Sequence, residues 1–371
     1  MINKYLVPAG FKDSLNFDTY IEHHYKNLII NSFIENGFNL IKTPLLEFCN
    51  NLDSNTLLIK TNKKSQRLGI RNDITPQIIR ISSSRLLNKQ RPLKLCYYGE
   101  VVRKSGSILR PERQFQQVGA EIIGSESYKA DVEIINLAYE TLKIIGVKNI
   151  VIEISAPFFL NNLLSKIKDV KLRNKIKKYI ALKDLNSCIR LLKSKELIKI
   201  FKTLYSCTGP IKIKKTNIEQ ISRLLGYPEE SKRLLNIAKL IQISKNDSIN
   251  LDLFEIHKNN KYYQGIKFTF FAKNVRGEIA GGGRYIIKYK DTIETAIGYT
   301  CYMDTILRAS SFTNKNKKIL IPFQTDKKTQ SLLIKRGYTL FKNFDGNNNL
   351  KIQTKKFGIK YYLQNKIVKK I

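Results

Sequence analysis

Two runs of β-type sequence separated by a polar segment constrain the fold of this chain most strongly. Leu93 to Val102 and Val118 to Ile123 are rich in apolar and β-branched residues, which favours two strands. The polar segment begins at Arg103 and ends with Gln117, and Glu121 lies within the second run. A guanidinium, an amide and a carboxylate held by one strand pair suit a ligand that carries both a positive and a negative charge.

Helical and strand-type segments surround this pair. Their periodicity predicts helices at 17–36, 76–87 and 131–145 and strands at 38–44, 57–60, 67–74, 262–271 and 295–302. Between about 160 and 248 the sequence is rich in Leu, Ile and Lys at helical spacing, so we expect an inserted helical subdomain there. A polar linker at 310–318 precedes a short α/β remainder. These boundaries predict a core over residues 1–310 and a short C-terminal domain over 311–371.

The formal net charge of +36 is the strongest signal in the composition. An excess of this size suggests a nucleic-acid or other polyanionic partner. Lysine, however, recurs with Ile and Asn along the whole chain, and no basic stretch is regularly interleaved with aromatic residues of the kind that stack bases. We therefore attribute the charge to overall composition, and a nucleic-acid partner is not expected.

Other residue patterns favour a cytoplasmic protein without a metal centre. The five cysteines show no Cys-x-x-Cys spacing and the chain has three histidines, so a zinc site is not expected. The chain has no run of about 18 apolar residues and no apolar leader, so neither a membrane span nor a secretion signal is expected. No sequence motif for a cofactor is found.

Six segments, in the same order along the chain, resemble the histidyl-tRNA synthetase-like proteins, and most closely the regulatory subunits of ATP phosphoribosyltransferase. The matching segments are Leu6 to Asp13, Thr43 to Glu47, Arg71 to Gln77, Arg103 to Gly124, Lys261 to Gly265 and Gly281 to Tyr285. The resemblance implies an α+β fold, the class II aminoacyl-tRNA synthetase core, with an antiparallel sheet flanked by helices. It also implies a dimer paired through the core near Pro44. Taken alone, the Gly281 to Gly283 run favours a tight turn.

The resemblance also implies a pocket for free histidine. The residues that match the histidine-binding positions are Asp73, Thr75, Arg103, Gln117, Glu121, Tyr262 and Tyr263. Carboxylate, amide and hydroxyl oxygens suit the ligand's ammonium group, a guanidinium suits its carboxylate, and aromatic faces suit its imidazole. Each residue also has an ordinary structural explanation, because Asp73 could cap a helix entered at Pro76 and the tyrosines could belong to the core.

Three departures from the synthetase pattern argue against catalysis. Ser105 stands where the synthetases have a glutamate that helps to hold ATP, and Lys258 stands where they have a catalytic arginine. Asp304-Thr305 replaces a Glu-Arg pair whose arginine meets the adenine and the triphosphate. Losing these groups removes the charge that stabilises adenylate formation. The segment after Lys318 is also shorter than the anticodon-binding domain of a synthetase.

The leading hypothesis is therefore a regulatory subunit without catalytic residues. The resemblance implies that it assembles with the short-form catalytic subunit of ATP phosphoribosyltransferase, is required for its activity, and relays feedback inhibition by histidine in the first step of histidine biosynthesis. Whether the inhibitory histidine occupies the inherited pocket or a subunit interface stays open. The alternatives are a divergent, active histidyl-tRNA synthetase and an RNA-binding relative of the synthetases.

Overall fold

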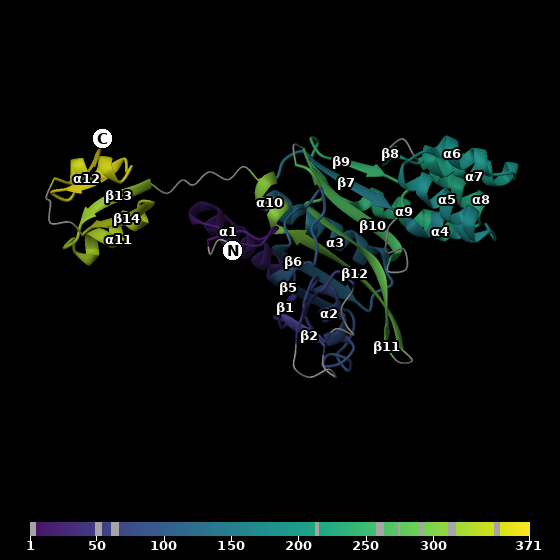
Figure 1. The fold of residues 1–371 in the computed structure, drawn as a ribbon, viewed down its shortest axis with the longest axis horizontal. Coiled ribbons are helices and arrows are strands. Elements are labelled where there is room, and N and C mark those ends of the chain that lie inside the picture. The colour runs from purple at the N-terminus through teal and green to yellow at the C-terminus, as the bar shows by residue number, and fades with distance from the viewer. Residues whose placement is uncertain are drawn as a thin grey trace. The chain divides into compact units, whose positions relative to one another are not determined.

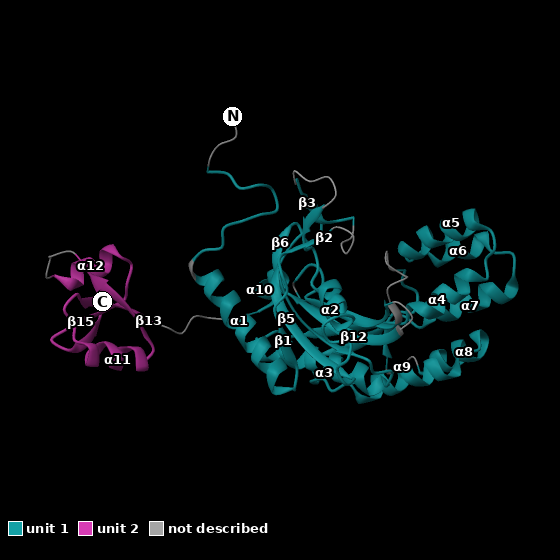
Figure 2. Cartoon of the chain, turned by 90° about the horizontal axis from the view of Figure 1, so that it is seen from below, with its two compact units in different colours: residues 1–311 teal, residues 312–371 magenta. Residues whose placement is uncertain are grey.

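The chain forms two compact units, Met1–Ser311 and Phe312–Ile371 (Figure 2). The structure, a computed structural model, describes residues 5–48, 54–60, 67–211, 215–256, 263–273, 275–289, 292–310, 317–344 and 349–371. Each unit has a β-sheet of its own. The mixture of long helices and a large, mostly antiparallel sheet is the α+β class predicted from the sequence.

A nine-stranded sheet organises the first unit (Figure 1). Its strands are β1 Asn39–Ile41, β5 Leu93–Val102, β6 Gln114–Ile123, β7 Ile150–Ser155, β8 Gly209–Pro210, β9 Ser248–Leu251, β10 Tyr263–Ala272, β11 Ala280–Tyr289 and β12 Thr292–Tyr302. They lie in the order β1-β5-β6-β12-β11-β10-β7-β9-β8, and the pairs from β5 through β7 are antiparallel. The long connection from β6 to β12 therefore brings residues near 120 and near 300 side by side.

Helices cover both faces of this sheet, with a different role on each. α1 (Asn16–Glu35) and α3 (Tyr128–Ile144) pack on one face, where Phe33 meets Tyr299 edge-on at 5.8 Å between ring centroids. α3 begins at Ser127, whose side chain accepts a hydrogen bond from the Lys129 amide. On the opposite face, α2 (Thr75–Ser82) contributes Ile78 to a cluster of buried residues. That opposite face contains the candidate site.

Three short strands and one helix complete the sheet's surroundings. β2 (Leu46–Phe48), β3 (Leu57–Ile59) and β4 (Leu68–Ile70) form a separate antiparallel sheet in the order β2-β4-β3. α10 (Met303–Ala309) follows β12 directly and packs against β6 and α1. The helix expected at 76–87 is shorter than predicted, because α2 ends at Ser82 and the chain continues in turns.

Helices occupy most of the segment between β7 and β9 (Figure 1). They are α4 Pro157–Ser165, α5 Val170–Ala181, α6 Leu185–Leu191, α7 Lys195–Ser206, α8 Lys215–Leu225 and α9 Pro228–Leu240. Side chains of Asp169, Asp184 and Ser194 accept backbone N–H groups at the starts of α5, α6 and α7, which fixes where these helices begin. α9 is tied to the core by an ion-pair network around Asp131 on α3: Arg233 Nη2 lies 2.5 Å from its Oδ2, and Arg284 Nε lies 2.7 Å from its Oδ1.

The second unit is a small four-stranded sheet with helices on both faces. Its elements are β13 Lys317–Pro322, α11 Lys327–Lys335, β14 Tyr338–Asn343, α12 Leu350–Lys356, β15 Tyr361–Gln364 and β16 Ile367–Lys370, and the strand order is β14-β13-β15-β16. β13 is parallel to both of its neighbours. Ile319 and Ile321 face Leu333 of α11, whereas Leu320 faces Leu350 of α12. Because the middle of β13 is buried on both faces, its sequence from Ile319 to Ile321 is continuously apolar.

Candidate ligand-binding site

A cavity on the α2 face of the large sheet brings together segments that are far apart in the sequence. It is lined by Asp73, Thr75, Arg103, Gln117, Glu121, Gly281, Gly282, Gly283, Tyr285, Gly298, Tyr299, Thr300 and Tyr302. Its volume is about 80 Å³, which is room for roughly five to eight water molecules. The site is therefore of a size for a small metabolite.

Five of the seven residues singled out from the sequence line this cavity: Asp73, Thr75, Arg103, Gln117 and Glu121. Of the other two, Tyr262 lies outside the described residues. Tyr263 begins β10, where its backbone pairs with Tyr285 across an irregularity in the ladder.

Glu121 is the most deeply placed carboxyl group of the site. Its side chain is 2% exposed, and its two oxygens accept hydrogen bonds from the Thr75 hydroxyl at 3.1 Å and the Tyr285 hydroxyl at 2.9 Å. The Tyr97 hydroxyl extends this network, because it lies 3.0 Å from Thr75 Oγ1 and 2.7 Å from Thr300 Oγ1. Four strands and the start of α2 thus meet in one chain of hydrogen-bonded groups.

Glycines on the central strands make the space for this network. Gly298 of β12 lies opposite Glu121 in the strand register, and a Cβ on Gly298 would stand 1.6 Å from Glu121 Oε2. A Cβ on Gly282 would stand 2.0 Å from the Gly298 carbonyl oxygen. The prediction of a tight turn at Gly281 to Gly283 is therefore wrong, because the three glycines lie inside β11. At Gly282 the neighbouring strand leaves no room for a side chain.

Arg71 anchors the segment that presents Asp73 and Thr75. This guanidinium is 5% exposed and donates to the Glu100 carbonyl at 2.7 Å and to the Thr43 hydroxyl at 2.8 Å. These bonds tie the segment to β5 and to the chain after β1. Because the side chain satisfies buried carbonyl groups from two separate elements, it fixes the position at which α2 begins.

Asp73 and Arg103, which are partly exposed, and the buried Gln117 form the other side of the cavity. Gln117 Oε1 accepts the Ile74 amide at 3.1 Å, which orients the side-chain amide. Burial raises the pKa of Asp73, whereas the Thr75 amide and the positive charge of Arg103 lower it. Ile74 occupies the N-cap position of α2, and Asp73 only accepts a long hydrogen bond of 3.4 Å from the Thr75 amide. Helix capping therefore does not account for the placement of this carboxylate.

The electrostatics of the deep end favour a neutral acid when the cavity is empty. Burial raises the pKa of Glu121 to about 8, with the Tyr285 and Thr75 hydroxyls opposing the shift. Burial also raises the pKa of Tyr97 well above its usual value, so this phenol stays protonated. A ligand ammonium group beside Glu121 would favour the carboxylate form and displace its proton.

Among the described residues, those that depart from the synthetase pattern place no free cation here. Thr305 is fully buried and donates its hydroxyl to the Tyr302 carbonyl at 3.0 Å, and the exposed Ser105 contacts Asn55. Asp304 pairs with Arg110 at 3.1 Å. Lys258 lies outside the described residues.

Arg110 is the cation closest to these positions, and it is already engaged. It is 6% exposed, and its guanidinium lies 3.9 Å from the centroid of the Tyr302 ring and 5.2 Å from that of Phe115. The Asp304 carboxylate neutralises it. A guanidinium that is stacked, paired and buried in this way is not available to bind phosphate groups.

Sequence reasoning missed several residues of the site, chiefly Thr300 and Tyr302, which line the cavity, and Tyr97, which belongs to its hydrogen-bond network. Tyr97 lies in β5 opposite Gly119, and Thr300 lies in β12 opposite the same glycine from the other side. Strand alternation places such residues on the cavity face once the order β5-β6-β12-β11 is known. That order depends on pairings across almost 200 residues, which no local pattern reveals.

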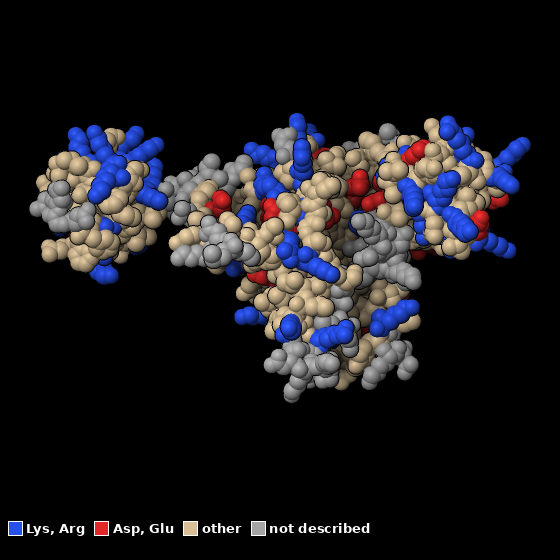
Figure 3. Space-filling model, viewed as in Figure 1, with Lys and Arg blue, Asp and Glu red and all other residues tan. Residues whose placement is uncertain are grey.

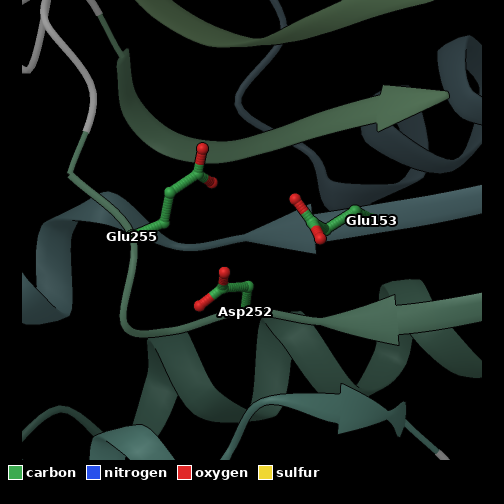
Figure 4. Close-up of side chains that lie close together, drawn as sticks. All are labelled: Glu153, Asp252 and Glu255. Carbon is green, nitrogen blue, oxygen red and sulfur yellow. The ribbon is translucent and has the colours of Figure 1, made fainter. Parts of the chain in front are cut away.

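Three carboxylates outside the cavity also lie together. Glu153 on β7 and Asp252 and Glu255 after β9 bring their oxygens within 4.8 Å of one another, and Figure 4 shows the three groups turned towards a common space. Lys183 pairs with Asp252, and Lys267 lies 3.5 Å from Glu255. These amino groups compensate the charge, so we read the cluster as part of the ion-pair network beneath the inserted helices.

No helix in the part of the chain that the structure describes has both the length and the apolar character needed to cross a membrane. The long helices α1 and α3 instead belong to the layer that packs on the sheet.

Comparisons with known proteins agree with the fold and the order of the motifs. The histidyl-tRNA synthetase family profile matches residues 10–306. An ATP phosphoribosyltransferase regulatory subunit from Clostridium botulinum is 30% identical over 97% of this chain and 92% of its own length, and one from Paramagnetospirillum magneticum is 27% identical over 97% and 96%.

Solved structures show the same fold at lower identity. A Bacillus halodurans protein described as an ATP phosphoribosyltransferase regulatory subunit/histidyl-tRNA synthetase superposes with a TM-score of 0.78 at 20% identity, covering 95% of this chain and 96% of that one. A chain of the Thermotoga maritima ATP phosphoribosyl transferase (HisG:HisZ) complex superposes with a TM-score of 0.60 at 18% identity, covering 76% and 98%. The predicted class II synthetase-like core is thus confirmed, and the chain belongs to the family of ATP phosphoribosyltransferase regulatory subunits, whose fold is that of histidyl-tRNA synthetase.

Proposed function

We propose that this chain is the non-catalytic regulatory subunit of an ATP phosphoribosyltransferase, the enzyme of the first step of histidine biosynthesis. It binds the short-form catalytic subunit, is required for its activity, and conveys inhibition by histidine. One observation carries this proposal: five of the residues that match the amino-acid side of a synthetase site line one cavity, while at two positions that depart from the synthetase pattern Asp304 is paired with Arg110 and Thr305 is buried. The HisG:HisZ complex that shares the fold supports a catalytic partner.

Histidine is the ligand that we assign to the cavity. Glu121, Thr75 and Gln117 surround the place for its ammonium group, with Asp73 nearby, and Arg103 faces its carboxylate. When the ligand ammonium displaces the Glu121 proton, it lies beside a negative charge while Arg103 meets the carboxylate, and this orients a zwitterion. We assign no catalytic role to any of these residues, because none is placed beside a group that could activate a phosphate.

The remaining assignments follow from the family. We propose a cytoplasmic protein that needs no cofactor, with a synthetase-like core over residues 1–310 interrupted by the helical insertion at about 160–248, and a short C-terminal domain over 311–371. The core is proposed to dimerise near Pro44, where Leu45, Leu46 and Phe48 are each at least 44% exposed. Apolar side chains exposed together at this density mark an interaction surface.

The test is phosphoribosyl-ATP formation by a short catalytic subunit from the same source, with and without this chain and with histidine titrated in. Activity that requires this chain and falls as histidine is added supports the proposal. Asp73→Ala and Gln117→Ala are expected to raise the histidine concentration for half inhibition by about tenfold or more, since each removes a polar partner in a buried site. Ser105→Ala is the matched control, because Ser105 contacts Asn55 outside the cavity.

Two results would contradict the proposal. The first is a catalytic subunit that shows the same activity with and without this chain. The second is histidine-dependent pyrophosphate exchange by this chain alone, which would reassign it to the active histidyl-tRNA synthetases. Normal activation together with unchanged inhibition in the Asp73 and Gln117 variants would retain the regulatory role and move the inhibitory histidine to another site.

A further inference from the structure

The positive charge of this protein is concentrated in its C-terminal unit. Residues 312–371 contain 15 Lys and Arg against two Asp and no Glu, a formal net charge of +13 on 60 residues. The 311 residues before them carry the remaining +23. Per residue, the C-terminal unit is therefore about three times as positive, and Figure 3 shows its Lys and Arg side chains gathered along one edge of the unit.

The scarcity of acidic residues in this unit distinguishes its charge from one that a general preference for lysine would produce. A bias towards Lys raises the number of cations but does not remove acidic residues. Asp326, the one acidic residue of this unit that the structure describes, accepts the Thr329 amide and hydroxyl at 2.8 Å each and so caps α11. This single described carboxylate offsets only a small part of the lysine charge of the unit.

Two exposed phenylalanines of this unit lie close together, and one of them has a lysine over its ring. Phe323 follows β13 and Phe344 follows β14, so both lie at the carboxyl ends of adjacent parallel strands, where open α/β sheets bind ligands. They are 58% and 78% exposed, and their ring centroids are 5.7 Å apart. The Lys342 ammonium lies 5.6 Å from the centre of the Phe323 ring, and exposed Lys327 and Lys328 begin the helix that follows.

A second aromatic pair lies at the opposite end of the same strands. Tyr338 and Tyr361 are partly exposed, with ring centroids 5.6 Å apart, and the ammonium of the exposed Lys317 lies 5.6 Å from the Tyr361 ring. Lys370 pairs with Tyr361 in the next strand and is exposed. Aromatic faces with adjacent cations thus occur at both ends of β13.

We propose that the C-terminal unit binds single-stranded nucleic acid, with bases stacking on Phe323 and Phe344 and the backbone phosphates held by the surrounding lysines. Exposed aromatic faces within a strongly basic surface are the two components of a single-strand binding site, since every base has a face to stack and every nucleotide carries a charge. A protein partner is the less suitable occupant, because the centres of protein interfaces are depleted in lysine. The proposal is independent of the histidine cavity and goes beyond the regulatory function.

The test uses the full chain and end-labelled oligonucleotides of about 12 nucleotides, a uridine RNA and a thymidine DNA, followed by fluorescence anisotropy. Both are titrated at several salt concentrations between about 50 and 200 mM, with a duplex of the same length for comparison. We expect saturable binding of the single strands that weakens as salt rises, and weaker binding of the duplex, whose bases cannot reach the rings. Tighter binding of RNA than of DNA would assign RNA as the ligand, and equal binding would assign single strands in general.

Two variants separate stacking from charge. F323A/F344A is expected to weaken binding by roughly tenfold or more at every salt concentration, with the salt slope unchanged. K327A/K328A/K342A is expected to reduce the slope of log K against log salt by about 2, because each phosphate contact contributes about 0.7. The matched controls are L182A, which removes another exposed apolar side chain, and K171A/K175A/K178A, which removes three exposed lysines from α5.

Three outcomes would overturn the proposal: no saturable binding at about 100 mM salt, equally tight binding of the duplex, or equal losses in the α5 control and in the C-terminal lysine variant. If F323A/F344A keeps its affinity for the oligonucleotides but no longer activates the catalytic subunit, the two phenylalanines form a protein interface and the proposal fails. Because both side chains are exposed, the far-UV circular dichroism and the unfolding midpoint of this variant should match those of the wild type.

Discussion

The cavity that we assign to histidine and the C-terminal unit use charged groups in opposite ways. In the cavity a few ionisable groups of both signs are at least partly buried, and the deepest, Glu121, has Thr75 and Tyr285 as hydrogen-bond partners. In the C-terminal unit many groups of one sign face solvent, and Asp326 is the one acidic side chain among its described residues. Buried groups specify one ligand and one geometry, whereas a dense surface charge attracts a class of polyanion. The difference predicts that substitutions in the core change stability and specificity, and that substitutions in the C-terminal unit change binding alone.

The largest effect is expected at Asp131. This fully buried carboxylate neutralises Arg233 and Arg284, so Asp131→Ala leaves two guanidinium groups without their partner and should cost about 3–5 kcal/mol of unfolding free energy. The comparison is Asp326→Ala in the C-terminal unit, which removes an exposed helix cap and should cost about 1 kcal/mol. Urea unfolding followed by far-UV circular dichroism measures both. Equal losses for the two would remove the contrast between the regions.

A second effect is expected where glycine makes room for the cavity. Gly298→Ala places a methyl group against the Glu121 carboxyl group and should cost about 2–3 kcal/mol together with the loss of histidine inhibition. Gly281→Ala is the matched control for stability alone, because its added Cβ would meet no atom closer than 3.7 Å but Gly281 also lines the cavity. Thermal unfolding and the histidine titration measure the two consequences. If Gly298→Ala behaved like its control, the close packing around Glu121 would not be required.

These glycines also show where sequence reasoning succeeded and where it failed. The strand Leu93–Val102 was predicted with its observed bounds, because its apolar pattern is local. The order of the polar residues that reach the cavity was likewise readable along one stretch from Arg103 to Glu121. The role of Gly298 was not, since it depends on pairing with β6 across more than 170 residues. In the sequence, a run of three glycines indicates a flexible backbone. Only the register of the paired strands shows that glycine is needed there because the strands and side chains pack too closely for a Cβ.

The concentration of positive charge in the C-terminal unit was not recognised from the sequence, for a different reason. Windows of a few residues find lysine everywhere, so its concentration emerges only when the chain is divided at residue 312. The exposure of Phe323 and Phe344 could not be read either, because an apolar residue at a strand end is equally compatible with a small core. α12, β15 and β16 were not predicted, since each is only four to seven residues long and gives little periodicity to read.

A third prediction concerns pH and is specific to the cavity. With the pKa of Glu121 near 8, binding of an ammonium group below that pH requires loss of the proton. The affinity for histidine should therefore rise with pH, by up to about tenfold per unit, and level off near pH 8. Glu121→Gln should bind histidine more weakly and lose this component of the dependence. Isothermal titration in buffers of different ionisation enthalpy measures the released proton, and no release near pH 7 would contradict the assignment.

The same carboxyl group predicts the opposite trend for stability without ligand. Its pKa in the folded state is higher than the ordinary value of 4.5, so the folded protein holds a proton that the unfolded chain releases. The stability from this group is therefore fully present below pH 4.5 and is lost as the pH rises towards about 8. Urea unfolding of wild type and Glu121→Gln across this window measures the trend. Parallel curves for the two proteins would show that Glu121 is ionised in the empty cavity.

The smallest effect on folding is expected from the lysines around Phe323. K327A/K328A/K342A should change the unfolding free energy by less than about 0.5 kcal/mol per residue, because exposed side chains outside a cap or a core contribute little. Removing three like charges even lowers the repulsion within a unit of net charge +13. The same variant should lose part of the salt dependence of oligonucleotide binding. A large loss of stability would instead mean that these lysines support the fold, and the distinction between positioned charge in the cavity and surface charge in the C-terminal unit would then fail.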